Sequence, residues 1–425
     1  MATETTFVYA DLEGVPSLVG RLCFHSKAAR ESASFEYDGS WLSSPHRFSL
    51  NPALALVSGS FHSSSNTLFG SLGDSAPDRW GRALMRRDER RQALADRRTP
   101  RTLREIDYLL MVDDEARQGA LRFSRSEGGP FLSEPKVSRI PPLLQLAEIM
   151  FASERVVADK DNDEDLRLLL GPGSSLGGAR PKASVRDRDG SLMIAKFQRQ
   201  DDEFNNVLWE ALTLSLAKQA GINTAESRLE TVHGRSVLML RRFDRDKTHR
   251  LPFLSGMSML AANDNETRSY LELADVLRRF GGSPAQDISS LWRRVAFNVL
   301  VSNTDDHLRN HGFLYNHSLG GWLLSPAYDL NPVPAEIKPR FLSTAIDAED
   351  TTASIDLAMS VTPYFGLSMK GARDILKQVV TAVSRWREEA LRIGVRQEEI
   401  ARMASAFEHE DLRRARLICG YTHRE

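Results

Sequence analysis

The loop at residues 302–315, SNTDDHLRNHGFLY, concentrates side chains that can move protons and bind hard metal ions. Asp305 and Asn310 lie five positions apart in it, after an apolar-periodic run, ISSLWRRVAFNVLV, that predicts a helix. In kinase catalytic loops an Asp accepts the proton of the attacking hydroxyl, and an Asn five residues later binds magnesium through its side-chain oxygen. Loops rich in Asp and Asn produce this spacing by chance, so the interpretation needs support elsewhere in the chain.

A second carboxylate follows nineteen residues after Asn310. Asp329 lies in LLSPAYDLNP, just past the strand-like segment GGWLLS. A carboxylate at the end of a hairpin that returns from the first loop can coordinate the same cation, since Mg²⁺ prefers oxygen ligands and nucleotide phosphates. Asn310 and Asp329 therefore predict a two-point magnesium clamp.

The histidines of the loop allow a different metal site. His307 and His311 have the spacing of zinc ligands on one helix face, but Gly312 and the many Asp and Asn residues favour a loop, and the HExxH glutamate is absent. We expect His307 to hydrogen-bond the loop. His311 and His317 are expected to be exposed.

Two segments upstream carry residues suited to a nucleotide. Lys196 ends the apolar strand pattern SLMIAKFQ, where it could meet phosphates as a point charge, with Glu210 on the next predicted helix as its ion-pair partner. The segment GSSLGGARPK precedes that strand. Its glycines would let the backbone approach phosphates closely, and Lys182 adds charge, although the segment is neither a Walker A sequence nor a kinase G-x-G-x-x-G loop.

Periodicity along the chain indicates the elements that position these residues. Residues 6–72 alternate apolar and polar residues between turn formers, which predicts a β-rich start. Helical spacing follows from residue 74, and a turn-rich stretch at 126–141 resembles a linker. The segment NNVLWEALTLSLAKQAGIN predicts a long helix that stops near Gly221. The segment RLETVHGRSVLMLRRFDR predicts a hairpin turning at His233 and Gly234, and the chain after about residue 255 is mostly helical. We expect an α+β protein with segments 1–125, 142–245 and 246–425.

Arginines are dense between residues 82 and 104, next to Asp88, Glu89, Asp96 and Glu105. They predict either a solvated helical face or a binding patch. The formal net charge of −1 argues against a protein that coats nucleic acid by itself.

Composition narrows the class of protein further. The chain is 41% hydrophobic and 27% charged, as in a soluble globular protein, with neither an apolar run of about 18 residues nor a start like a signal peptide. Its two cysteines, Cys23 and Cys419, indicate neither a disulfide framework nor a clustered metal site. We expect a cytoplasmic protein without a membrane partner.

In chain order, the glycine loop, strand lysine, helix glutamate, Asp-x4-Asn and second Asp form a constellation, and here the chain resembles a known family. It is similar to the HipA toxins, serine/threonine kinases of bacterial type II toxin–antitoxin modules with a two-lobed fold related to protein kinases. The resemblance rests on DSAPDRWGRALM, DYLLMVDDEARQGALRF, GGARPKA, RRFDR, TDDHLRN and YDL. It implies an N-terminal subdomain (1–125), a small lobe with phosphate loop and hinge (142–245) and a helical large lobe (246–425).

Carried over residue by residue, the resemblance implies that Asp305 is the catalytic base and that Asn310 and Asp329 bind Mg²⁺. The residues that it implies for ATP binding are Gly177, Gly178, Ala179, Lys182, Lys196, Arg241, Phe243, His307 and Tyr328. Ser175, with Ser174 beside it, matches a serine that family members phosphorylate on themselves. Arg241, Asp306 and Arg309 depart from the family's glutamate, small residue and lysine.

The resemblance also implies partners. These are a helix-turn-helix antitoxin, operator DNA bound mainly through that antitoxin, and a protein substrate, possibly an aminoacyl-tRNA synthetase. Two alternatives stay open: a catalytically silent corepressor that uses arginine-rich stretches such as 86–104 or DLRRARLICGYTHRE, and a small-molecule kinase.

Overall fold

The computed structural model describes residues 2–27, 30–63, 67–134, 138–173, 180–247, 249–264 and 266–421. The chain forms two compact units, Met1–Asp201 with Glu230–Leu254, and Asp202–Leu229 with Ser255–Glu425. Helices and antiparallel sheets both occur, which confirms the predicted α+β class. The three segments predicted from the sequence, 1–125, 142–245 and 246–425, do not coincide with these two units. Because one compact unit can contain two subdomains, the division into three segments stays a prediction.

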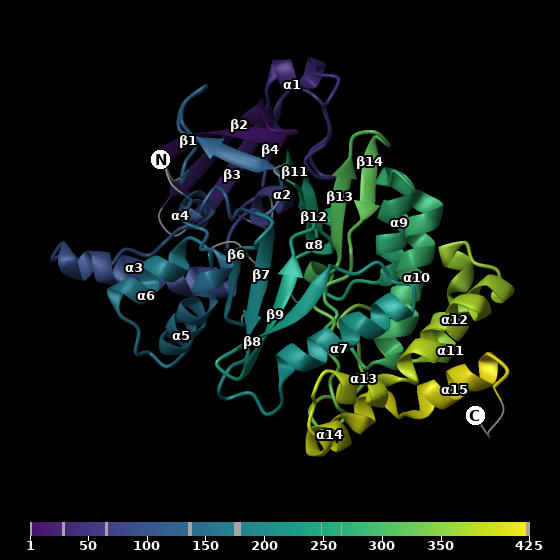
Figure 1. Ribbon diagram of the computed structural model, residues 1–425. Coiled ribbons are helices and arrows are strands. Elements are labelled where there is room, and N and C mark those ends of the chain that lie inside the picture. The colour runs from purple at the N-terminus through teal and green to yellow at the C-terminus, as the bar shows by residue number, and fades with distance from the viewer. Residues whose placement is uncertain are drawn as a thin grey trace. The chain divides into compact units, whose positions relative to one another are not determined.

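A five-stranded sheet in the order β4-β3-β2-β1-β5 opens the first unit (Figure 1). Its strands are β1 (Ala2–Leu12), β2 (Val15–Lys27), β3 (Arg30–Tyr37), β4 (Ser60–His62) and β5 (Leu121–Ser124), with the short helices α1 (Gly39–Ser43) and α2 (Gly70–Gly73). Glu13 and Gly14 have φ of 53° and 83°, the conformation of a two-residue turn that matches the twist of a hairpin. The β-rich start predicted from alternation is confirmed.

Two helices follow in the arginine-rich stretch, α3 (Arg79–Ala95) and α4 (Glu105–Met111). Asp78 caps α3 by accepting a hydrogen bond from the Gly81 amide at 2.7 Å. Arg87 and Arg91 both pair with Asp161, at 2.8 and 2.7 Å. Arg82 pairs with Glu105 and Arg98 with Glu89, both at 2.6 Å. Together these carboxylates neutralise much of the stretch, which favours a charge-balanced helical face over a binding patch.

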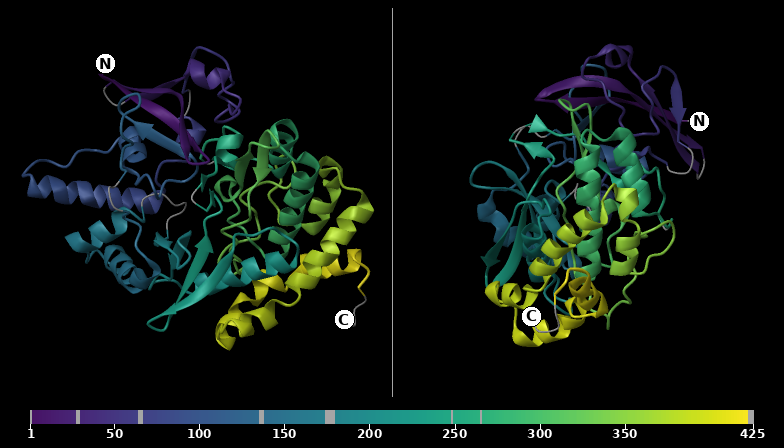
Figure 2. Two further views of the ribbon diagram at one scale, coloured as in Figure 1. Left: turned by 45° about the horizontal axis from the view of Figure 1, so that its top comes forward. Right: turned by 90° about the vertical axis from the view of Figure 1, so that its right-hand side faces the viewer.

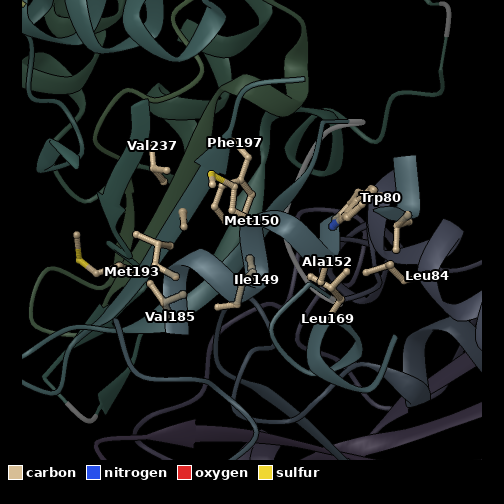
Figure 3. Close-up of a cluster of buried hydrophobic side chains, with 14 of the residues drawn as sticks. Trp80, Leu84, Ile149, Met150, Ala152, Leu169, Val185, Met193, Phe197 and Val237 are labelled. Atoms are coloured by element: carbon tan, nitrogen blue, oxygen red, sulfur yellow. The ribbon is translucent and has the colours of Figure 1, made fainter. Parts of the chain in front are cut away.

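The second sheet of this unit has the order β6-β7-β9-β8. It comprises β6 (Lys182–Arg186), β7 (Leu192–Phe197), β8 (Ser227–Val232) and β9 (Arg235–Arg241), and it follows η1 (Leu143–Gln145), α5 (Leu146–Val157) and α6 (Asp163–Leu170). The hairpin turns at His233 and Gly234, with φ of 48° and 76°, as predicted. Figure 3 shows side chains of α3, α5 and α6 packed with Val185, Met193 and Val237 of the sheet in one apolar core.

A buried ionic network ties the segment after β9 to residues 115–119. The Asp244 carboxylate accepts from Arg242 Nε at 2.9 Å, Arg245 Nη1 at 2.8 Å and the Gly119 amide at 2.8 Å. The same two guanidinium groups donate to the Arg117 carbonyl, at 3.1 and 2.7 Å. Burial alone would raise the pKa of Asp244, but Arg242 and Arg245 hold it well below its usual range.

The second unit is mostly helical, as predicted. Its elements are α7 (Asn206–Gln219), α8 (Gly256–Met259), α9 (Tyr270–Phe280), α10 (Pro284–Leu300), η2 (Leu308–Asn310), β13 (Gly312–Asn316), β14 (Gly321–Leu324), α11 (Ile355–Ser360), η3 (Thr362–Phe365), α12 (Met369–Val383), α13 (Trp386–Arg392), α14 (Gln397–Phe407) and α15 (Glu410–Ile418). The short strands β10 (Arg245–Asp246), β11 (His249–Arg250) and β12 (Phe253–Ser255) lie between β9 and α8 along the chain.

Helix α10 packs between α9 and α12 (Figures 1 and 2). Leu291, Trp292 and Val295 of α10 are fully buried. Helix α7 ends where the sequence predicted, because Gly221 takes the left-handed conformation (φ 75°) and its amide caps the Lys218 carbonyl at 3.1 Å. Among the described residues, no helix is both long and apolar enough to cross a membrane.

Removing the charge of Asp244 should destabilise the protein strongly, because Asp244→Asn leaves two buried guanidinium groups without their anion. We expect a loss of about 3–5 kcal/mol at pH 7, measured by denaturant unfolding. The pKa of this carboxyl is depressed in the folded state, so the wild-type advantage is present above the unfolded pKa, about 4, and should shrink as the pH falls below it. The exposed neighbour Asp246→Asn is the control; an equal loss there would contradict a specific role for Asp244.

Candidate active site

The loop after α10 separates two adjacent carboxylates. Asp305 is exposed and Asp306 is buried. The Asp305 carbonyl accepts from the His307 amide at 2.9 Å and from Asn310 Nδ2 at 3.1 Å. The predicted five-residue spacing thus closes a compact turn in which the Asp305 carboxylate faces solvent and the Asn310 amide oxygen is left as an acceptor.

The buried side chain of Asp306 anchors this turn on the side away from solvent. Its Oδ2 atom accepts from the Tyr270 hydroxyl, from Asn298 Nδ2 at 2.8 Å and from His311 Nε2 at 3.0 Å. The Thr344 hydroxyl donates to the Asp306 carbonyl at 2.7 Å. Asp306 differs from the small residue that the resemblance implies at this position, and its side chain is buried rather than exposed to solvent.

Burial and charge act in opposite directions on the Asp306 carboxyl. Burial would raise its pKa, but the attraction of His311 and the hydrogen bonds from His311 and Tyr270 hold it below its usual range. The pKa of Tyr270 is raised well above its usual value by burial and by the neighbouring Asp306 charge. The pair therefore consists of an ionised carboxylate and a neutral phenol that donates to it.

The histidine predictions were partly wrong. His311 was expected to be exposed, but it is 2% exposed because Asp306 and the edge of the Tyr270 ring enclose it. His307 is exposed, so the two histidines share no face that could hold zinc. In the described part of the chain, no group of three or more His, Cys, Asp or Glu side chains is arranged for a metal. His317 is half-buried, and its ring centroid lies 4.9 Å from that of Tyr315.

The segment around Asp329 is held against the same loop. The Tyr328 hydroxyl donates to the Arg309 carbonyl at 2.8 Å, and the Asn331 amide donates to Asn303 Oδ1 at 3.2 Å. Asp329 lies between these contacts with φ of 54°. It follows the hairpin of β13 and β14, as the sequence predicted. The amide oxygen of Asn310 and the carboxylate of Asp329 have the chemistry of the hard oxygen ligands that Mg²⁺ requires.

The predicted phosphate-binding residues of the first unit are only partly described. Ser174, Ser175, Gly177, Gly178 and Ala179 lie outside the described residues. Lys182 is buried, and its Nζ atom pairs with Asp78 Oδ2 at 3.0 Å. The Trp80 indole also donates to the Lys182 carbonyl at 3.0 Å, so the start of α3 holds the start of β6. Lys196 lies opposite Lys182 on β7.

The remaining predicted residues occupy both units. Arg241 ends β9 and pairs with Asp189 at 2.6 Å, while the Phe243 ring lies 6.3 Å from that of Phe253. Glu210 is buried in α7 of the second unit, whereas Lys196 belongs to the first. Their ion pair, and the assembly of one site from both units, stay predictions. The structure brings together Asp305, His307, Asn310, Tyr328 and Asp329.

Sequence reasoning missed the residues that support these groups. Asp78 and Tyr270 have no motif spacing, because their partners Lys182 and Asp306 are distant in sequence. Asn298 lies only eight residues before Asp306, but it falls within a predicted helix and belongs to no motif. The doubled aspartate at 305–306 was a signal, since one of two adjacent loop carboxylates commonly faces inward. Its partner His311 could have been suspected from the same five-residue spacing that joins Asp305 to Asn310.

Residues 174–387, half of the chain, match the family model described as HipA-like C-terminal domain. The chain belongs to this family. The structure of HipA from Shewanella oneidensis MR-1, solved with HipB and operator DNA, is similar over 98% of both chains, with a TM-score of 0.68 and 17% sequence identity. That likeness shows that the family member described here has the HipA fold.

Two other proteins are also similar to this chain, one over a short part of its length and the other with a low structural similarity. The putative kinase Y4mE of Sinorhizobium fredii is 26% identical over 160 residues, which are 35% of this chain and 37% of that protein. The match thus spans little more than a third of Y4mE. The proinflammatory kinase CtkA of Helicobacter pylori covers 53% of this HipA-like chain and 93% of its own, but the TM-score of 0.37 is too low to support an argument.

Lys182 should contribute strongly to stability as well as to any phosphate contact. Lys182→Met removes the ammonium group 3.0 Å from the buried Asp78 carboxylate, at an expected cost of about 3–5 kcal/mol in urea unfolding. Adding Asp78→Asn removes that charge and keeps an N-cap acceptor, so the double variant should recover most of the loss. The exposed Lys160→Met is the control; additive effects of the two substitutions would contradict the pair.

Proposed function

We propose that this chain is an ATP- and magnesium-dependent serine/threonine kinase and the toxin of a toxin–antitoxin module. The observation that carries the proposal is the turn that presents Asp305 to solvent, with Asn310 bonded to the Asp305 carbonyl and the segment before Asp329 bonded to the same loop through Tyr328. Family membership and the HipA fold support it. The name of the relative Y4mE, a putative kinase, agrees with it.

In this mechanism Asp305 accepts the proton of the attacking hydroxyl, and Asn310 and Asp329 hold magnesium. Bound magnesium–ATP supplies the phosphoryl group and the cation that offsets its charge. Arg241 and Phe243 offer backbone groups to the adenine, and Lys182, Lys196, Gly177, Gly178 and Ala179 contact phosphates. His307 and Tyr328 border the nucleotide. Phosphoryl transfer needs positioning and charge neutralisation rather than covalent chemistry from the protein.

The partners follow from the same proposal. The Shewanella HipA structure contains HipB and operator DNA, and we infer an equivalent antitoxin with a helix-turn-helix for this chain, through which DNA is bound. The substrate would be a protein, with an aminoacyl-tRNA synthetase as the candidate, which would place the kinase in the cytoplasm. The corepressor alternative gains little support, because Arg413 and Arg414 of the C-terminal stretch pair with Glu410 and Asp356, as Arg87 and Arg91 do with their carboxylates.

The test is to add the purified protein and γ-labelled ATP to a bacterial lysate and to identify what becomes labelled. A labelled protein supports the proposal. Label in a small molecule alone would show a small-molecule kinase, and no transfer with tight operator binding in the presence of the antitoxin would show a corepressor.

Asp305→Asn should reduce phosphoryl transfer at least about 100-fold, because the amide keeps the size of the side chain but cannot accept the proton. Stability should change by less than about 0.5 kcal/mol, since Asp305 is exposed. Single-turnover rates with labelled ATP and a melting curve measure the two effects. A folded variant with wild-type rates would remove Asp305 from the mechanism.

Autophosphorylation at Ser175 or Ser174 should inactivate the kinase. A phosphoserine adds a charge of about −1.5 to −2 beside the bound phosphates, which it would repel. Incubation with magnesium and ATP, phosphosite mapping by mass spectrometry and ATP titration before and after would measure both steps. Two unmodified serines in an active kinase, or unchanged ATP affinity after modification, would exclude this switch; turn formation would then explain both serines.

A further inference from the structure

Both ends of the loop that carries Asp305 and Asn310 are fixed by one buried hydrogen-bonded pair, Asp306 and His311. Asp306 directly follows Asp305, and His311 directly follows Asn310. Asp306 Oδ2 and His311 Nε2 are 3.0 Å apart, and both side chains are 2% exposed. The separation of the proposed base and the proposed metal ligand is therefore held by a contact between their neighbours, in addition to the direct bond from Asn310 Nδ2 to the Asp305 carbonyl.

Two helices hold that hydrogen-bonded pair in place. Tyr270, the first residue of α9, and Asn298, near the end of α10, both donate to the carboxylate oxygen that His311 uses. Tyr270 is fully buried and Asn298 is 1% exposed. Asn298 also accepts from Asn303 Nδ2 at 3.1 Å, which fixes the start of the loop as well.

We propose that Tyr270, Asn298, Asp306 and His311, the Asp306 cluster, are positioning residues that set the separation of Asp305 and Asn310. This inference rests on the proposed function for its catalytic consequence. A buried carboxylate with three donors on one oxygen has few alternative arrangements, because moving it leaves several buried donors unsatisfied. A displacement of about 1 Å in such a frame can cost about 100-fold in rate.

The variants must loosen the cluster without unfolding the protein. Replacing Asp306 would leave three buried donors without an acceptor, so Tyr270→Phe and His311→Leu, each of which removes one donor, are better choices. His311→Gln is the conservative partner, because its amide can still donate to Asp306. Tyr364→Phe, at a position 60% exposed in the same unit, is the matched control for loss of a phenol hydroxyl.

Steady-state kinetics with labelled ATP at varied magnesium separates positioning from simple loss of folded protein. For Tyr270→Phe and His311→Leu we expect kcat to fall by about tenfold or more and half-saturating Mg²⁺ to rise, with adenosine affinity unchanged and His311→Gln close to wild type. A smaller folded fraction would instead lower kcat and adenosine binding capacity together and leave the Mg²⁺ requirement unchanged. That result would overturn the proposal.

Amide hydrogen exchange tests the anchoring without any turnover. Exchange of residues 303–312 should speed up in Tyr270→Phe and His311→Leu, and should stay at the wild-type rate in Tyr364→Phe. Wild-type exchange in folded Tyr270→Phe and His311→Leu would overturn the positioning role. An inactive wild-type protein would instead refute the proposed function, while faster exchange in the two variants would still support the anchoring.

Discussion

The candidate site depends on one buried carboxylate. Asp306 is 2% exposed. It holds the loop because Tyr270, Asn298 and His311 all donate hydrogen bonds to one of its carboxylate oxygens. An unpaired carboxylate at this depth would be costly, so the hydrogen-bonded arrangement is strongly preferred over other loop conformations. The exposed Asp305 is then presented to solvent by a backbone that has little freedom to move.

Two buried carboxylates, Asp244 and Asp78, have a similar anchoring role in the first unit. Asp244 joins Arg242 and Arg245 to the segment at residues 115–119, and Asp78 joins the start of α3 to Lys182. The Asp78–Lys182 pair itself joins two distant segments, whereas Asp244 pairs with neighbouring arginines and the group reaches the distant segment through the Gly119 amide and the Arg117 carbonyl. Both groups are adjacent to predicted nucleotide contacts. Apolar packing of the sheet against α3, α5 and α6 supplies the bulk of the stability, whereas these pairs fix the arrangement of the segments.

Local patterns in the sequence predicted most elements, because alternation, helical spacing and turn residues act over short distances. The hairpin at His233 and Gly234, the end of α7 near Gly221 and the turn that joins Asp305 to Asn310 were all predicted in this way. Burial of His311 and the support from Tyr270 were not, because both depend on packing between α9, α10 and the loop. Two adjacent aspartates are alike in sequence, and only the fold decides which one faces solvent.

The central claim is that oxygen ligands on this loop and its neighbouring segment hold a magnesium nucleotide. Calorimetric titration of magnesium–ATP and of adenosine into the wild type and Asp329→Asn tests it directly. Asn also tolerates the left-handed backbone found at Asp329, so the substitution changes the ligand charge rather than the fold. The account predicts weaker magnesium–ATP binding with unchanged adenosine binding, whereas equal losses for both ligands, or no loss for either, would contradict it.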